Sequence, residues 1–373
     1  TVDLFNEGID VPTVDTLLLL RPTESATLFL QQLGRGLRRS PGKSECTVLD
    51  FVGHHRREFR FDLKYRALLG GTRRELEQQI EHGVPFLPAG CHFDLDPVAR
   101  GEVLRSIRNA IPTRWPERVA ELRAVGNVGL ATFLAATGLD LDDLYANNRS
   151  WSELRRAADL PTAPPGPDEP TLLRAVGRLL HVDDDERIEH YRAFASATAP
   201  LTPAAMNERE RRLLRMFLAS MLPSTRETSL EAAHAQLLAH PQVCAEIAEL
   251  MSVLSERVER PQQPLATNPD APLHPHARYT RIEIQAALND GSAVRPPRWD
   301  SGVKWLPGER ADVFAFTLDK TSGAFSPTTR YRDYAISPEL IHWETQSVTS
   351  VASPTGQRYL NHVSEGTTIL LFA

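Results

Sequence analysis

The sequence predicts an α+β protein of several domains: a partial α/β piece, a central all-helical region, and a C-terminal domain that is a mostly antiparallel β barrel or sandwich. Apolar residues form short strand-like runs near the N-terminal end, follow a helical period from residue 57, and return to short runs near the C-terminal end. A proline-rich stretch separates the last two regions. The length of 373 residues also fits two or three domains.

The composition predicts an ordinary globular protein without a membrane span or a metal centre. Charged residues make up 24% and hydrophobic residues 41% of the chain. No apolar run reaches the ~18 residues that cross a bilayer. Cys46, Cys91 and Cys244 lie far apart without a zinc pattern, which favours the cytoplasm. The net charge of −6 gives no general attraction for nucleic acid, although a local groove can still bind phosphates.

The first domain is expected over residues 1–56, where strand, helix and strand alternate as in a parallel sheet. Behind the strand-like run 16–20 comes a basic segment, 31–39, which reads QQLGRGLRR. We expect a turn there that leads into a basic helix, with Arg35 and Arg38 on one helical face. The alternative for these arginines alone is a basic surface turn after an amphipathic helix.

Arginines in this pattern suit phosphate chemistry. The guanidinium of Arg35 or Arg38 can donate two parallel hydrogen bonds to a phosphate and keeps its proton. Gly34 lets a ligand come close to the backbone. Such arginine fingers accelerate phosphoryl transfer by about 10³–10⁵-fold.

A second motif precedes the first strand. Residues 6–12 read NEGIDVP, in which Gly8 permits a tight turn. Asp10 is then a candidate to bind a ribose hydroxyl or to orient an arginine.

A third segment imitates a phosphate-binding loop. Residues 36–44 read GLRRSPGKS, but five residues separate the glycines where that loop needs four. The segment also leads into a strand, so no helix N-terminus is available for phosphate. We therefore expect a solvated turn.

Residues 6–12 and 31–38 resemble motifs V and VI of the superfamily-two DEAD/DEAH-box helicases. This resemblance covers residues 1–53 and implies the C-terminal part of a second RecA-like domain, with 46–51 as its last strand. It implies that Arg35 and Arg38 are arginine fingers. It further implies that Gly8, Asp10, Gln31 and Gly34 face the nucleotide. Asn6 and Glu7 would face the nucleic acid.

The same resemblance implies cofactors and partners. ATP and Mg²⁺ would be bound mainly by a first RecA-like domain, whose Walker A and DEAD or DEAH motifs do not occur in this sequence. We therefore expect a fragment that hydrolyses no ATP alone. Its partners would be DNA, with RNA left open, and the N-terminal remainder of the same protein.

Other phrases resemble a bacterial group of large helicases that end in a domain of unknown function. They are 86–92 (FLPAGCH), 325–329 (FSPTT) and 342–347 (HWETQS). The resemblance implies relatives with a complete motor, often preceded by a phospholipase-D-like nuclease domain. It implies no chemistry for the C-terminal part.

A helical region is expected over 57–260, with a split into two lobes near the proline-rich stretch 161–170. Residues 130–145 read as helix, glycine turn and helix, and Ser150 as the N-cap of a further helix. That helix carries Arg155 and Arg156. They are candidate DNA contacts, against the alternative of simple helical packing.

Residues 261–277 hold five prolines and predict an extended, semi-rigid linker. The last domain, 278–373, is expected to begin with a helix at 282–288 and to continue with β-type runs. Its aromatic residues, among them Trp343, either stack on bases or fill the core of a small β-domain.

These observations favour the C-terminal fragment of an ATP-dependent DNA helicase or translocase. The alternative is a recognition module of a defence or restriction system, without catalysis of its own.

Overall fold

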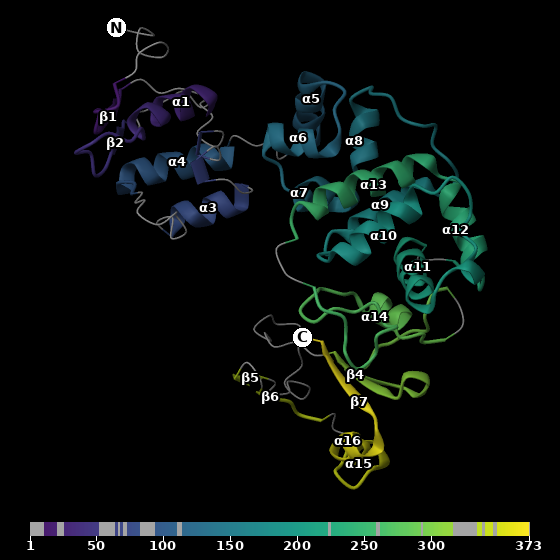
Figure 1. Ribbon diagram of the computed structural model, residues 1–373. Helices are drawn as coiled ribbons and strands as arrows, with labels where there is room; N and C mark the ends of the chain where they lie inside the picture. The colour runs from purple at the N-terminus through teal and green to yellow at the C-terminus, as the bar shows by residue number, and fades with distance from the viewer. Residues whose placement is uncertain are drawn as a thin grey trace. The chain divides into compact units, whose positions relative to one another are not determined.

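The structure is a computed structural model, drawn in Figure 1. It divides into two compact units, Thr1–Thr162 and Ala163–Ala373. The residues that the structure describes are 11–20, 26–51, 64–65, 68–69, 73–82, 94–109, 114–222, 225–258, 262–291, 294–315, 334–337, 340–345 and 349–372.

A strand–helix–strand element opens the first unit. Strands β1 (Thr16–Leu19) and β2 (Thr47–Asp50) pair in parallel, with Leu18 opposite Leu49. Helix α1 (Ala26–Gly36) connects them, as Figure 1 shows in purple. A helical crossover is the usual connection between neighbouring parallel strands.

The two faces of this strand pair differ. Phe29 and Leu33 of α1 are buried, and Gly36 lies against Leu17 of β1. On the other face Leu18 and Leu49 are 55% and 47% exposed. Parallel sheets normally have both faces covered. Among the described residues, therefore, this pair has one covered face and one open apolar face.

The rest of the first unit is helical. A small core joins two helices through Leu76, Ile80, Val103 and Ile107. The helices are α3 (Arg73–Glu81), α4 (Pro97–Asn109), α5 (Trp115–Val125), α6 (Leu130–Thr137), α7 (Leu141–Tyr145) and α8 (Trp151–Ala157), with the 3₁₀ turn η1 (Ala146–Asn148) before α8.

The expected helix–turn–helix outline has a physical basis at both ends. Helix α6 ends at Gly138, whose φ of 77° is the left-handed conformation that glycine tolerates best. At the start of α8 the hydroxyl of Ser150 accepts a hydrogen bond of 3.2 Å from the Glu153 N–H. Trp151 of α8 is fully buried, with its ring 5.2 Å from that of Phe133.

The second unit begins with a helical core. Helix α10 packs against α13, and α11 packs against α14. The helical period in the sequence of α11 is followed by five apolar residues that are all buried: Leu213, Leu214, Phe217, Leu218 and Met221. The elements are α9 (Glu169–Val176), η2 (Gly177–Leu179), α10 (Asp185–Ala195), η3 (Pro203–Ala205), α11 (Glu208–Met221), α12 (Leu230–Leu238), α13 (Pro241–Ser255) and α14 (Arg281–Ala287).

The predicted linker 261–277 is packed over much of its described part. Ala271 and Leu273 are buried. The guanidinium of Arg209 in α11 donates hydrogen bonds of 2.5 and 2.8 Å to the carbonyls of Pro269 and Ala271. The segment therefore differs from a solvated spacer, because its apolar residues are buried and its carbonyls have a cationic donor.

Two small sheets form the last part of the chain. The first has the order β3-β4-β7, in which β3 and β4 are antiparallel and β4 and β7 are parallel. The second is an antiparallel pair of β5 and β6. The described residues contain no closed barrel, so the expected barrel or sandwich stays a prediction. The strands are β3 (Val303–Leu306), β4 (Ala311–Ala315), β5 (Tyr334–Ser337), β6 (Leu340–His342) and β7 (Thr368–Phe372), and the 3₁₀ turn η4 (Pro307–Glu309) joins β3 to β4.

Two short helices precede β7. They are α15 (Pro354–Leu360) and α16 (His362–Glu365). Residues 354–356 read PTG, which are residue types common in turns, but they begin α15. The Ser353 hydroxyl accepts from the Gly356 N–H at 3.1 Å, and Pro354 occupies the first turn, where its missing N–H costs nothing.

None of the described helices has both the length and the apolar composition to cross a membrane by itself; two sharply bent helix pairs pass that test jointly.

Candidate functional site

The motif that resembles helicase motif VI lies at the C-terminal end of α1. Gln31 and Gly34 are exposed on this helix, and Arg35 is half-buried in its last turn. Arg38 is exposed two residues beyond the helix end. Four other predicted site residues, Asn6, Glu7, Gly8 and Asp10, lie outside the described residues.

The expected turn into a basic helix is wrong in direction: Arg35 lies in the last turn of helix α1, and the turn that carries Arg38 follows the helix. Helix α1 ends at Gly36, so Arg38 does not share a helical face with Arg35. Cations favour a helix C-terminus because the last carbonyls carry partial negative charge. The approaching Pro41 also disfavours helical backbone at the preceding residue.

The two glycines of this motif have different surroundings. A Cβ atom built on Gly36 would lie 2.6 Å from Leu17 Cδ1 and 2.7 Å from Cys46 Sγ, so packing of the helix on β1 requires glycine here. A Cβ built on Gly34 would meet nothing within 4 Å. Alanine is the better helix former at such a position. Nothing in this part of the fold therefore explains glycine at position 34.

The segment that imitates a phosphate-binding loop holds a lysine with a different role. The ammonium group of Lys43 donates hydrogen bonds to the carbonyls of Gly36, Arg38 (3.0 Å) and Pro12 (3.4 Å). A phosphate-binding lysine acts beside a helix N-terminus, whereas Lys43 lies at the C-terminal end of α1. The expected solvated turn therefore has an additional role, since its Lys43 caps the end of α1.

A buried ion pair adjoins the end of β2. Lys64 is 2% exposed, and its ammonium lies 2.5 Å from Asp50 Oδ2 and 4.6 Å from the centre of the Phe29 ring. Burial, and then the Asp50 charge, raise the pKa of Tyr65. Carboxyl ends of parallel strands are common ligand sites. Here, however, the lysine compensates Asp50, so the pair fastens the segment at Lys64 to β2. Sequence spacing alone gave no signal for this contact.

The predicted DNA contacts in α8 have structural partners. The guanidinium of Arg155 donates to Val128 O (2.8 Å), Asn127 Oδ1 (2.7 Å) and Pro161 O (3.1 Å). Arg156 is half-exposed. These bonds support the packing alternative for Arg155, and DNA contact at α8 stays a prediction.

Trp343 belongs to a half-exposed aromatic cluster. Its ring centre lies 4.4 Å from that of Phe314 and 5.9 Å from that of Tyr359. Beside it, the guanidinium of Arg358 donates to both oxygens of the buried Asp312, at 2.6 and 2.8 Å. The same guanidinium lies 4.2 Å from the centre of the Trp305 ring. Packing explains the buried side of the cluster. Stacking of bases on its exposed side stays a prediction.

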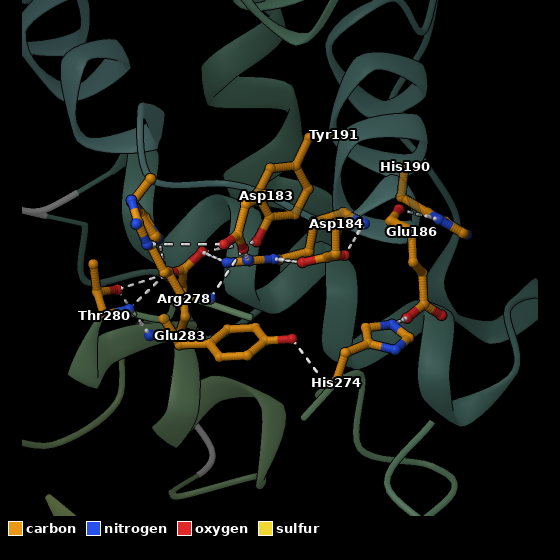
Figure 2. A network of polar contacts seen from close by, with 12 residues as sticks. Asp183, Asp184, Glu186, His190, Tyr191, His274, Arg278, Thr280 and Glu283 are labelled. Atoms are coloured by element: carbon orange, nitrogen blue, oxygen red, sulfur yellow. Dashed lines mark hydrogen bonds and ion pairs between the residues drawn. The ribbon is translucent and has the colours of Figure 1, made fainter. Parts of the chain in front are cut away.

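A buried ionic network links α10 to α14 in the second unit (Figure 2). At its centre, Arg187 pairs with the N-cap carboxylate of Asp184 and, at 3.1 Å, with Glu283 Oε1. Glu283 also accepts from His181 Nε2 at 2.6 Å. Burial raises the pKa of Glu283, but Arg187 and His181 outweigh it and lower this pKa to about 2.

The network continues toward the segment before α14. Figure 2 shows the ring of His274 facing the carboxylate of Glu186, with Nε2 2.7 Å from Oε2. Arg209 completes the pairing of Glu186 at 2.5 Å. The hydrogen bond to Glu186 raises the pKa of His274. Burial raises the pKa of Glu186, but hydrogen bonds from His274 and Arg209 lower it to about 2.

This network has the chemistry of a structural element, because its carboxylates face arginine and histidine donors within the same unit. The acidic run 183–186, directly before Arg187, was the signal in the sequence, since acidic residues favour helix N-termini. Among the described residues, no cluster of three or more histidine, cysteine or acidic side chains could hold a metal ion.

Comparison with known proteins gives short matches to helicases. "Putative ATP-dependent helicase IRC3" of Saccharomyces cerevisiae is 48% identical over 50 residues, which are 13% of this chain and 7% of that protein. "Putative mitochondrial ATP-dependent helicase irc3" of Schizosaccharomyces pombe is 46% identical over 54 residues, 14% of this chain and 9% of that protein. A "51.5 kDa protein" of a Lactococcus phage is 41% identical over 54 residues, 14% of this chain and 12% of that protein.

These matches make the chain a helicase-related protein. Residues 273–373 further match a protein family described as a domain of unknown function, DUF3427. The chain spans no more than 12% of the length of the three relatives above.

Proposed function

We propose that this chain is the C-terminal part of an ATP-dependent DNA helicase or translocase of superfamily two. The observation that carries the proposal is the motif QQLGRGLR at the end of the helix that joins two parallel strands, with Arg38 exposed. The short matches to ATP-dependent helicases support it.

In the proposed mechanism, Arg35 and Arg38 act on ATP that is bound mainly by another RecA-like domain. Their guanidinium groups donate hydrogen bonds to the γ-phosphate oxygens and neutralise the charge that develops there. The bare backbone at Gly34 lets the other domain or the nucleotide approach closely. The described residues hold no cluster suited to Mg²⁺, so we assign the ion to that other domain.

The open sheet face supports an incomplete α/β layer. Leu20 and Phe51 are 70% and 54% exposed beside Leu18 and Leu49. An apolar face of this kind on a parallel pair is normally covered by further helices of the same domain. We propose that the remainder of a RecA-like domain covers it.

The decisive experiment replaces Arg38 by alanine in the full gene product that contains this chain. We expect DNA-stimulated ATP hydrolysis to fall by about 10³-fold or more, as for other arginine fingers, while DNA affinity is retained. The neighbouring Arg39 is also exposed, so Arg39→Ala is a matched control that should keep near wild-type turnover. Wild-type turnover in Arg38→Ala would defeat the proposal.

The second candidate is a recognition module without catalysis, and the half-exposed aromatic cluster around Trp343 favours it. The same experiment separates the two. If the unmodified gene product binds DNA but shows no DNA-stimulated ATP hydrolysis, the result supports the recognition function over the helicase function.

A further inference from the structure

Lys43 joins two segments that are far apart in the sequence. Its ammonium group binds the carbonyls of Gly36 and Arg38, at the end of the motif VI-like segment. It also binds the carbonyl of Pro12, 3.4 Å away, at the end of the motif V-like segment. An ammonium group has three hydrogens to donate, so these three acceptors match its full capacity.

A tight turn brings Lys43 back to the helix end. The Lys43 N–H donates to Ser40 O at 3.1 Å, and Gly42 at the third position has a φ of 82°. Proline at the second position and a left-handed glycine at the third are the features of a type II turn. The residues Pro41 and Gly42 thus fix the direction in which the chain returns to α1.

A simple helix cap would explain only part of this arrangement. A cation near the last carbonyls of a helix is favourable, and Gly36 O is such a carbonyl. The other two acceptors lie outside α1, however: Arg38 follows the helix, and Pro12 precedes strand β1. The three bonds therefore fix the backbone of Arg38 relative to the chain that enters the sheet.

We propose that Lys43 is a positioning residue for Arg38. Lys43 holds the backbone of Arg38, so that the guanidinium group stays in the position from which it contacts the nucleotide. It also transmits movement of the Pro12 segment to Arg38. This inference rests on the proposed function, because it assigns Arg38 to the γ-phosphate. Lys43 itself touches neither nucleotide nor nucleic acid.

The test is Lys43→Met in the full gene product, since methionine keeps the length of the side chain but loses the donors. We expect kcat of DNA-stimulated ATP hydrolysis to fall about 10–100-fold, with KM for ATP within about twofold of wild type. Arg39→Met removes an equal charge from the same exposed loop and should leave kcat within about twofold. Thermal unfolding of each variant gives the folded fraction, to which kcat is normalised.

Arg38→Ala and the double variant complete the design. If Lys43 acts through Arg38, the double variant is no slower than Arg38→Ala alone. If Arg38→Ala is impaired but Lys43→Met turns over normally per folded molecule, the positioning role is overturned and the proposed function stands. If Arg38→Ala is itself fully active, the proposed function fails first. Equal losses in Lys43→Met and Arg39→Met would also overturn the positioning role, because they would indicate a general effect of charge.

Discussion

Replacing Gly34 by alanine separates the stability of helix α1 from its proposed function. A Cβ at this position meets no atom within 4 Å, so the substitution introduces no clash within the chain. Alanine is favoured over glycine in a helix by about 0.5–1 kcal/mol. Because Gly34 lies in the last turn of α1, we expect a gain near the lower value, about 0.5 kcal/mol in the free energy of unfolding.

The activity of the same variant should move in the opposite direction. If the nucleotide or another domain approaches the backbone at Gly34, the new methyl group occupies that contact. We expect kcat/KM of DNA-stimulated ATP hydrolysis to fall at least about tenfold in the full gene product. Urea unfolding followed by circular dichroism gives the stability, and a coupled ATPase assay gives the rate.

Gly36→Ala is the matched control in the same helix. Its Cβ would lie 2.6 Å from Leu17 Cδ1, so we expect a loss of about 1–3 kcal/mol from overpacking. A Gly34→Ala protein that is more stable and fully active would refute the reasoning. It would mean that no partner approaches α1 at Gly34, and the glycine would lose its functional explanation.

Three further predictions concern the buried ionic network. Glu283→Gln leaves Arg187 with one carboxylate fewer, and we expect a loss of about 3 kcal/mol in urea unfolding. Asp300→Asn, in an exposed pair with Arg298, should leave stability close to that of the wild type; similar losses in both variants would contradict a special role of burial. In acid, Glu186 and Glu283 should weaken the fold as the pH falls from about 4.5 toward 2, because their pKa values are lowered to about 2. At higher pH, the raised pKa of His274 means that its contribution to the free energy of unfolding is complete below pH 6.5 and is lost above its folded pKa. The difference in stability between wild type and His274→Gln should therefore shrink as the pH rises through that range. A difference that does not depend on pH would contradict this prediction.

The sequence predicted those elements that local patterns determine. Short apolar runs marked β1 and β2, and the helical period marked the buried stripe of α11. The cap at Ser150 follows from its side chain and needs no distant partner. At position 354, however, the same residue types serve both a turn and a helix start, so local patterns alone do not choose between them.

Contacts between distant residues could not be predicted in the same way. The end of α1 at Gly36 depends on Leu17 and Cys46, and its cap comes from Lys43 in the following turn. The pairing of Lys64 with Asp50 joins a helical residue to a strand end, without any regular spacing. Such contacts determine the geometry around Arg35 and Arg38. The motif therefore indicated the chemistry of the two arginines but not their orientation.

The start of the DUF3427 match at residue 273 does not coincide with an edge of the packing in the second unit. Glu283, ten residues later, completes the charge balance of Arg187 in α10. Helix α11 also holds the far end of α14, since Arg212 donates to Ala287 O at 3.1 Å. A boundary drawn at 273 would remove Glu283 from Arg187 and the Ala287 carbonyl from Arg212, while Arg187 would keep Asp184 and Arg212 would keep Glu208. Within the second unit, an ion pair and a hydrogen bond therefore join α10 and α11 to α14, the first helix of the DUF3427 region.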